Sequence, residues 1–429
     1  MKQQMRLGLQ TKNFLKTVLR ILPRKIRHQI MRKSLHLPTQ FPADVRFKVA
    51  ETAEEYIQSF SVLHDSYLRA GYVDPVKGGL RILPHHCLPS TSIIVAKINE
   101  KVVGTVTIIR DTSMRLPMDQ IFDLSSFRKR NLRIAEVSSL SIHPKHRGSH
   151  GLILHGLFRY IAIYAREHLK CDLLSVTVNP KMVNLYSAII CFEHLNQDTV
   201  QSYGFVKGAP AVGMIVDLVH LEEVTKRIYG NAPAHQNLND FYFRSSFPNF
   251  EFPKRKFPFI SDNYLSDEFI KYLLTEKTEI LQSWSFGEKF QILAAARFDP
   301  VLKEVLLPRH ATIQSAQLDR WRHDVWCPVE LQNIAGTIAK GEAWDLSQGG
   351  LKVHVPIEEN SHPSQWLYKL LRFSLQLENG ETVSGTAKVV WKSADGFMGL
   401  QINTVESNWS QLFGESVPFR RSNRKCHAD

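Results

Sequence analysis

The spacing of apolar and polar positions predicts two kinds of structure along this chain. Between about residues 46 and 230, segments with apolar residues three and four apart, typical of amphipathic helices, alternate with short apolar runs, typical of buried strands. The helical segments are 53–71 and 152–169, and the strands are 47–51, a pair over 91–111, 133–143, 171–178 and 208–219. Such alternation favours a mixed sheet flanked by helices.

In the C-terminal part of the chain, apolar and polar residues alternate with a period of two, which is typical of strands. Several short strands separated by Gly, Asn and Asp turns occupy 317–413 and predict a small antiparallel barrel or sandwich. The intervening region, 231–309, holds a stretch rich in Pro and Phe, followed by helical patterns over 267–284 and 288–307. We interpret it as a helical connector, with a helical extension of the first domain as the alternative.

Length and charge add to this picture. A chain of 429 residues exceeds what one hydrophobic core usually serves, so two or three domains are expected. The net charge of +13 comes from ten basic residues that precede Asp44 and a net three within 420–429. The body is therefore formally neutral, which argues against DNA or RNA as a partner. Five scattered cysteines without a Cys-x-x-Cys pair, and no secretory leader, favour the cytoplasm.

The N-terminal segment has its own pattern. Apolar residues recur at helical spacing with bases on the other side until Pro23 interrupts: Leu15, Val18, Leu19, Leu22 and Ile26. No apolar run approaches the roughly 20 residues needed to span a bilayer. One interpretation is an interfacial helix attracted to an acidic carrier or to anionic lipid, peripheral on the inner membrane. A disordered basic leader is the alternative.

The candidate chemistry lies in 133–192. A strand carrying Glu136 runs into a basic turn, which ends where a helix starts at Leu152. Free N–H groups at a helix start bind anions such as the pyrophosphate of an acyl-thioester carrier. Glu136 lies mid-strand among apolar residues, where burial raises a carboxyl pKa toward that of a useful base. An exposed strand glutamate is the alternative.

The order of these segments resembles the GNAT acyltransferases. Their motif A, Arg/Gln-x-x-Gly-x-Gly/Ala, is similar to the turn that starts at Arg147, although His150 and Leu152 stand at the two glycine positions. Four segments together resemble the N-acyl amino acid synthase branch, itself similar to the acyl-homoserine-lactone synthases: 63–75, 88–122, 134–148 and 178–195. This resemblance covers about 47–229. It implies transfer of a long acyl chain from acyl carrier protein or acyl-coenzyme A to the α-amine of an amino acid.

The same resemblance implies roles for single residues. Glu136, in the family's Glu-x-Ser-Arg/Ser pattern, would be the general base or amine orienter. Tyr186 would protonate the leaving thiolate, unless it is a core aromatic. Donor binding would fall to Ser139, Leu140, Arg147, Gly148, Ser149, Gly151 and Asn179. We expect no covalently bound cofactor and no metal, because the run His85-His86-Cys87 lacks a second pair at ligand spacing.

A second resemblance lies near the C-terminus. The stretch from Asp345 through Ser347 to Gly350 matches Asp/Asn-x-Ser-x-x-Gly, a signature of PilZ domains, and a strand, then VVW and GLQI, follow it. The resemblance covers about 317–413. It implies that these three residues contribute to a cyclic di-GMP site.

The upstream half of the PilZ signature, Arg-x-x-x-Arg, is only partly present. Arg320 fits its first position, but Asp324 occupies the second, where a carboxylate repels phosphate. Arg322 is the candidate substitute for the second arginine. A degenerate PilZ domain that serves only for contacts is the alternative to nucleotide binding.

These inferences combine into one prediction of fold and function. The fold class is α+β, with a GNAT-like mixed β-sheet flanked by helices, a helical connector and a small antiparallel PilZ-like β-barrel. The expected divisions are a basic amphipathic leader, the acyltransferase domain, the connector or extension, the barrel and a basic disordered tail, at 1–42, 43–230, 231–315, 316–414 and 415–429. The predicted protein is an N-acyltransferase with cyclic di-GMP as effector. The alternatives are an acetyl-coenzyme A-dependent enzyme acting on a protein or small amine, and a non-enzymatic cyclic di-GMP receptor.

Overall fold

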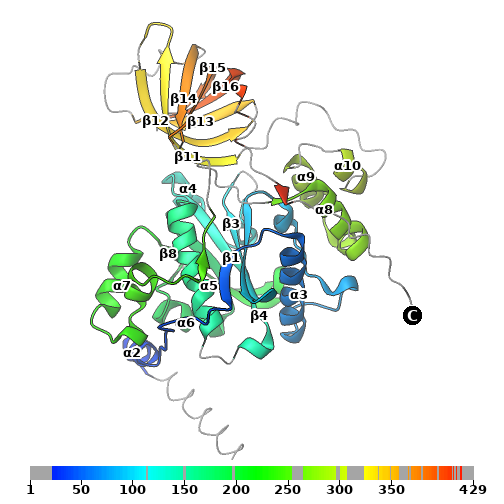
Figure 1. Ribbon diagram of the computed structural model, residues 1–429, viewed down its shortest axis with the longest axis vertical. Helices are drawn as coiled ribbons and strands as arrows, with labels where there is room; N and C mark the ends of the chain where they lie inside the picture. Colours follow the sequence, from blue (N-terminus) through cyan, green and yellow to red (C-terminus); the bar gives the residue numbers. More distant parts are fainter. Residues whose placement is uncertain are drawn as a thin grey trace, which may run out of the picture.

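The computed structural model contains a mixed sheet domain and a β-barrel (Figure 1). It describes residues 22–112, 115–147, 151–195, 199–253, 264–295, 300–306, 323–336, 338–347, 349–356, 366, 369–377, 380–393, 396–407, 409, 412 and 416–417. Four predicted site residues lie outside this set: Gly148, Ser149, Arg320 and Arg322. The first half of the predicted leader, residues 1–21, lies outside it as well.

The sheet follows the order β6-β8-β5-β4-β3-β2-β1-β9, with β7 paired to β8. Its strands are β1 (Val45–Val49), β2 (Thr91–Ile98), β3 (Lys101–Arg110), β4 (Ile134–Ile142), β5 (Leu173–Val178), β6 (Glu193–His194), β7 (Val200–Tyr203), β8 (Ala209–Asp217) and β9 (Phe250–Glu251). The pairs β4–β5 and β1–β9 are parallel, and the others are antiparallel. The predicted mixed sheet is confirmed.

Helices cover both faces of this sheet. They are α2 (Arg24–Lys33), α3 (Ala53–Arg69), α4 (Ser125–Lys129), α5 (Leu152–Ile163), α6 (Val183–Ala188), α7 (Leu221–Tyr229), α8 (Asp267–Tyr272), α9 (Phe286–Ala295) and α10 (Pro300–Leu306). Successive strand residues point to opposite faces. Ile93 of β2 therefore packs with α3, whereas Ile94 packs with α5. Burial on both faces explains the continuous apolar run of β2.

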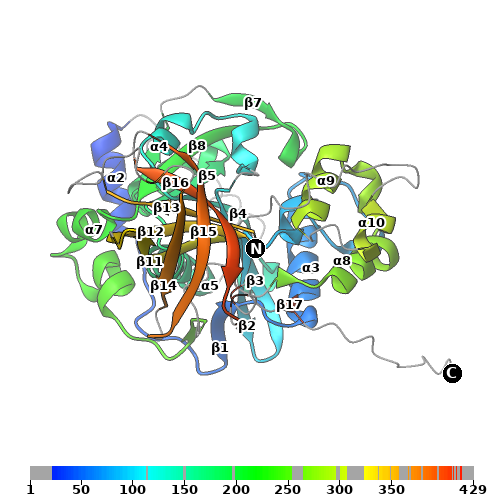
Figure 2. The same ribbon diagram turned by 90° about the horizontal axis from the view of Figure 1, so that it is seen from above.

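The region between the two domains is an extension of the sheet domain. Phe269 of α8, Ile292 of α9 and Leu302 of α10 are buried in one cluster with Phe60 of α3. Figure 2 shows these three helices gathered on the α3 side. Because these helices share a core with α3, they pack as an extension of the sheet domain would.

The C-terminal strands close into a barrel in the order β11-β12-β13-β16-β15-β14. They are β11 (His323–Asn333), β12 (Ile338–Ser347), β13 (Gly350–His354), β14 (Leu370–Gln376), β15 (Thr382–Lys392) and β16 (Phe397–Val405), all antiparallel to their neighbours. The alternation of apolar and polar residues predicted either a barrel or a sandwich, and the structure is a barrel. Closure pairs every strand on both sides and leaves no free sheet edge.

One short pairing follows the barrel. β10 (Tyr264–Leu265) runs parallel to β17 (Ser416–Val417). We expected 415–429 to be disordered, and this expectation is wrong for Ser416 and Val417. Pairing here depends on main-chain groups that meet in space, which the tail's basic composition does not show.

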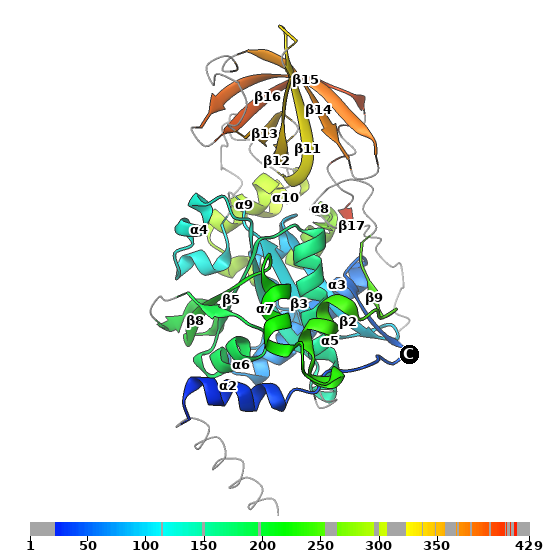
Figure 3. The same cartoon turned by 90° about the vertical axis from the view of Figure 1, so that its left-hand side faces the viewer.

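The first described helix lies at the end of the molecule away from the barrel (Figure 3). α2 begins directly after Pro23, so the predicted interruption marks a helix start. Arg32 donates from Nε to the Ala188 carbonyl oxygen at 2.8 Å, which ties α2 to the end of α6. Ile26 and Ile30 are exposed. Within the described residues, no helix combines the length and hydrophobicity that crossing a bilayer requires.

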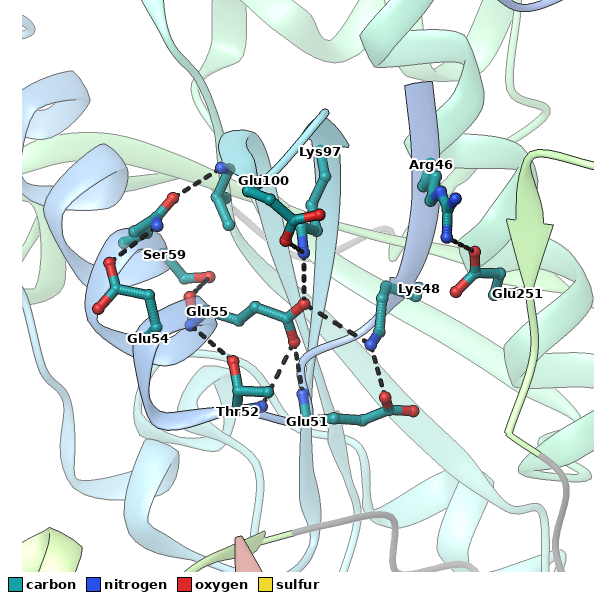
Figure 4. Close-up of polar contacts among 12 residues, drawn as sticks. Arg46, Lys48, Glu51, Thr52, Glu54, Glu55, Ser59, Lys97, Glu100 and Glu251 are labelled. Atoms are coloured by element: carbon teal, nitrogen blue, oxygen red, sulfur yellow. Dashed lines mark hydrogen bonds and ion pairs between the residues drawn. The ribbon is translucent and has the colours of Figure 1, made fainter. Parts of the chain in front are cut away.

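A buried carboxylate ties the start of α3 to two strands (Figure 4). Glu55 Oε1 accepts a hydrogen bond from Lys97 Nζ of β2 at 2.9 Å and lies 3.6 Å from Lys48 Nζ of β1. Its Oε2 accepts from the Glu51 amide at 2.8 Å. Burial alone would raise the Glu55 pKa, but the Glu51 amide and the two lysines bring it below its ordinary value. The charged form of Glu55 is therefore part of the fold.

Candidate active site

The two parallel strands β4 and β5 separate halfway along their length. They pair over residues 134–137 and 173–176, after which β5 pairs with β8 alone and β4 continues along β3. Two cavities of about 220 and 400 Å³ lie along the separated part of β4. They share the lining residues Tyr67, Tyr72 and Leu140 and are therefore neighbouring parts of one cleft.

A bulge in β4 shapes this cleft. Thr105 of β3 faces Ser141 while Thr107 faces Ser138, so β4 has one residue more than β3 here. Ser139 takes a φ of 57°, in the left-handed region that few non-glycine residues adopt. A bulge leaves its extra residue outside the ladder of main-chain hydrogen bonds. Ser139 and Leu140, for which we predicted main-chain contacts with the acyl donor, lie in the bulge and line the cleft.

Glu136 lines the smaller cavity and is 2% exposed. Its Oε2 accepts a hydrogen bond from the Met118 amide at 2.9 Å. Burial raises the Glu136 pKa to about 8, the Met118 amide opposes the rise and the Asp119 carboxylate adds to it. A carboxyl group with this pKa exchanges its proton near neutral pH, as a general base must. The alternative of an exposed strand glutamate is wrong.

The loop that presents the Met118 amide is held by ion pairs. Arg128 of α4 donates to Asp119 at 2.5 Å and, from Nε, to Asp111 at 2.6 Å. Asp119 also accepts from the Leu116 amide at 2.8 Å. One planar guanidinium that serves two carboxylates fixes the loop geometrically. The donor to Glu136 is thus positioned by the segment between β3 and β4.

Three tyrosines, two buried and one half-buried, line the same cavity as the Glu136 carboxyl group. Tyr67, Tyr186 and Tyr203 all line the smaller cavity. Burial raises the pKa of Tyr186 to about 12, so its hydroxyl keeps its proton at neutral pH. Burial also raises the pKa of Tyr203, with Glu136 contributing, and that of Tyr67, whose side chain is hydrogen-bonded with Ser139. Tyr186 is thus both packed, as a core aromatic would be, and part of the cleft wall.

The larger cavity reaches the start of α5. Gly151, with a φ of 75°, precedes the helix and lines the cavity together with Arg147. Arg147 donates from Nε to the Ile142 carbonyl oxygen at 2.8 Å and from its terminal nitrogen to Ser66 Oγ at 3.2 Å. Asn179, at the end of β5, lines the smaller cavity instead. The contacts predicted for Gly148 and Ser149 stay predictions, because both lie outside the described residues.

The described residues of the predicted nucleotide site, Asp345, Ser347 and Gly350, lie on the barrel around the turn between β12 and β13. Ser347 is buried, and its hydroxyl donates to the Gly350 carbonyl oxygen at 3.5 Å. Asp345 stands opposite Lys352 on one side and opposite Asp324 on the other. The residue at the second position of the arginine pattern is therefore the direct cross-strand neighbour of the signature aspartate in the register of the two strands.

Sequence reasoning missed four contributors to the cleft: the Met118 amide, Tyr67, Tyr72 and Tyr203. The first three lie in segments that carried the family resemblance, and their only signal was membership of those segments. Tyr203 lies on β7, a strand that the apolar pattern did not predict. Nothing in the sequence placed it beside Glu136.

The run His85-His86-Cys87 consists of neutral core residues. Burial lowers the His85 pKa to about 3 and that of His86 well below its ordinary value, and it raises the Cys87 pKa to about 12. His86 Nδ1 accepts from the Leu83 amide at 3.2 Å. Among the described residues, no three His, Cys, Asp or Glu side chains gather as metal ligands do.

Comparison with known proteins agrees with this geometry. Residues 58–217 match the family described as N-acyl amino acid synthase FeeM, and residues 319–413 match the PilZ domain family. No curated protein matches the chain. FeeM itself, an N-acyl amino acid synthase from uncultured soil microbes, is 22% identical over 42% of this chain and 94% of its own, with a TM-score of 0.37.

Two other solved structures are also similar. The AHL synthase LasI is 15% identical over 41% of this chain and 89% of its own, with a TM-score of 0.31. The putative acetyltransferase YncA from Salmonella typhimurium, solved with acetyl-CoA, is 14% identical over 41% and 94%, with a TM-score of 0.29. On the family matches, the chain carries an acyltransferase domain of the N-acyl amino acid synthase family, joined to a C-terminal PilZ domain.

Proposed function

We propose that this protein moves a long-chain acyl group from acyl carrier protein onto the α-amine of an amino acid. One observation carries the proposal: buried Glu136 lines a cleft between diverging strands and has a pKa of about 8. A thioester carbonyl can enter between such strands, and a carboxyl group that ionises near neutral pH can accept the proton of an incoming amine.

The chemistry follows from the residues of the cleft. Ionised Glu136 accepts a proton from the acceptor's ammonium group, and the freed nitrogen attacks the thioester carbonyl carbon. The carbon–sulfur bond then breaks, and the thiolate takes the proton of the Tyr186 hydroxyl. The second amine proton returns to Tyr186. The Met118 amide keeps the Glu136 carboxyl group in place during these steps.

The donor's place is supported by the bulge and the larger cavity. The main chain at Ser139 and Leu140 would pair with the pantetheine amides. Arg147, Gly151 and the neighbouring Gly148 and Ser149 would contact the phosphate, and Asn179 would border the thioester. A phosphopantetheine arm needs less room at the turn than coenzyme A, which suits His150 and Leu152 at the motif's glycine positions. The basic helix α2 offers an acidic carrier a docking surface, and anionic lipid is its other candidate partner.

A direct test follows from this proposal. Expression in a bacterial host should leave N-acyl amino acids in lipid extracts, detected by mass spectrometry, and Glu136→Gln should abolish them. The purified protein is then assayed with acyl-carrier protein, acyl-coenzyme A and acetyl-coenzyme A in parallel. Turnover of acetyl-coenzyme A alone would favour the acetyltransferase alternative. Cyclic di-GMP binding without any acyl transfer would favour a receptor.

We further propose that cyclic di-GMP acts on the cleft through a contact between the two domains. Trp344 is the extra residue of a bulge in β12, directly before Asp345. Its ring lies 6.0 Å from the Arg133 guanidinium, and Arg133 pairs with Asp172 at 3.2 Å. Arg133 directly precedes β4, three residues before Glu136. The contact therefore connects the nucleotide signature with the strand of the candidate base.

Calorimetric titration tests this regulation. Cyclic di-GMP should release heat with the unmodified protein and none with Asp345→Ala. Trp344→Ala should keep nucleotide binding but remove the effect of the nucleotide on acyl transfer. No heat with the unmodified protein would defeat nucleotide binding and would leave the PilZ domain as a contact module.

A further inference from the structure

The described side chains that line the cavity around Glu136 offer hydroxyl groups but no cation. Among the described residues that line it there are four tyrosines and no lysine, arginine or histidine. The ammonium group of an amino acid finds Glu136 as its partner there, whereas the carboxylate finds no positive charge. Taking an unpaired carboxylate out of water is costly. His146 and Arg147 line the neighbouring cavity instead, where we place the phosphate of the donor. This leaves the rim of the cavity around Glu136 as the place from which a further counter-ion can reach the carboxylate of the acceptor.

Two loops supply facing parts of this rim. Tyr72, in the loop after α3, and Val206, in the turn between β7 and β8, both line the cavity. Lys207, the next residue after Val206, donates from Nζ to Asp74 Oδ1 at 2.6 Å. Asp74 lies two residues beyond Tyr72. The ion pair thus connects the two loops beside the cavity.

Lys207 can give up the Asp74 carboxylate and bind another carboxylate in its place at little cost in free energy. The Lys207 side chain is 53% exposed and that of Asp74 is 76% exposed, so water competes with the pair and it stabilises the fold little. Lys207 has a φ of 53° and Gly208 one of 79°. These two left-handed residues make the sharp turn that leads into β8.

We propose that Lys207 is the counter-ion for the carboxylate of the acceptor, which it receives in exchange for Asp74. The ammonium group then faces Glu136 and the carboxylate faces Lys207, so the acceptor is oriented by its two ends. This inference rests on the proposed acyl transfer and adds a basis for selecting amino acids over plain amines. Asp74 holds Lys207 at the rim while no acceptor is bound.

The test compares amino acids with the amines that lack only the carboxylate. Phenylalanine is paired with phenethylamine and leucine with 3-methylbutylamine, and kcat and KM are measured with acyl-carrier protein as donor. Lys207→Met should raise KM for the amino acids about tenfold, the size expected for a lost charged hydrogen bond, with kcat nearly unchanged. KM for the amines should stay the same. Lys207→Arg, which keeps the positive charge, should leave KM for the amino acids close to that of the unmodified protein.

Asp74→Asn is the matched variant. It removes the competing anion and should lower KM for the amino acids, and both variants should keep the melting temperature because the pair is exposed. Equal changes in KM for amino acids and amines, or a preference of the unmodified protein for amines, would overturn the inference while acyl transfer stands. Transfer to neither class of acceptor would overturn the proposed function together with this inference.

Discussion

Two buried glutamates of the sheet domain lie in opposite electrostatic surroundings. Glu55, at the start of α3, and Glu136, in the cleft, are 4% and 2% exposed. Glu55 is met by the Glu51 amide and the lysines of β1 and β2, and its pKa is lowered. Glu136 accepts a hydrogen bond from one amide and lies near the Asp119 carboxylate, and burial raises its pKa to about 8.

Burial alone therefore does not make a carboxyl group reactive. Glu55 stays ionised because two ammonium groups and a backbone amide replace the water it lost, and its charge joins α3 to β1 and β2. Glu136 has lost its water without gaining a cation. It borders a cavity, so a substrate's ammonium group can take the place that Lys97 fills for Glu55.

The largest expected effect separates the two residues by activity. Glu136→Gln should lower kcat by about 10²- to 10⁴-fold, the usual contribution of a general base. Glu55→Gln should leave kcat per folded molecule unchanged, because Glu55 lies away from the cleft. Both are measured in single-turnover acyl transfer, with the folded fraction determined by circular dichroism. Equal losses in the two variants would contradict the distinction.

The second effect separates them by stability. Glu55→Ala should reduce the free energy of unfolding by about 3 kcal/mol, because it leaves Lys97 and Lys48 without their buried partner. Urea unfolding measures the change. Glu100→Ala is the control, since Glu100 also pairs with Lys97 but is 94% exposed, and its loss should cost less than about 1 kcal/mol. A similar cost for both variants would show that burial of the pair does not matter.

A smaller effect concerns the second residue of the proton path. Tyr186→Phe should lower kcat about tenfold and change KM little, because the ring still packs while the thiolate loses its proton donor. Acyl donors with better leaving thiols should lose less activity. If kcat stays the same with every donor, Tyr186 serves only as a core aromatic.

The smallest effect is a difference in pH dependence. Activity should rise with pH through about 8 as Glu136 ionises, and Glu136→Gln should remove this part of the pH profile.

The two glutamates should also change the stability of the fold in opposite directions as the pH rises. The Glu136 pKa lies above its ordinary value of 4.5. The contribution of Glu136 to the free energy of unfolding is therefore fully present below pH 4.5 and is lost as the pH rises through about 8. The Glu55 pKa lies below 4.5, so its stabilisation is lost as pH falls below that value. Urea unfolding at a series of pH values checks both signs.

Local pattern was a good guide to the elements of the fold. The spacing of three and four predicted a helix over 53–71, and α3 covers Ala53–Arg69. The strand of Glu136 was likewise predicted over 133–143, and β4 covers Ile134–Ile142. Short pieces such as β6, β7 and β9 were missed, because two to four residues hold too little periodicity to be recognised.

The candidate site was predictable only where it lies on one segment. Glu136, Ser139 and Leu140 share β4, and the bulge that contains the last two became visible only in their pairing with β3. Tyr203 and the Met118 amide reach Glu136 from separate parts of the chain. Lys207 and Asp74 also come from separate parts of the chain, since they are 133 positions apart.

The sequence by itself determined which segments become helices and strands, and it named the families of both domains, because periodicity and motifs are properties of neighbouring residues. Only the tertiary structure decided that the pKa of Glu136 is raised while that of Glu55 is lowered, and that Lys207 stands at the rim of the cleft. A pKa and an ion pair depend on distances between side chains and on the water excluded around them. Those quantities exist only once distant segments have packed together.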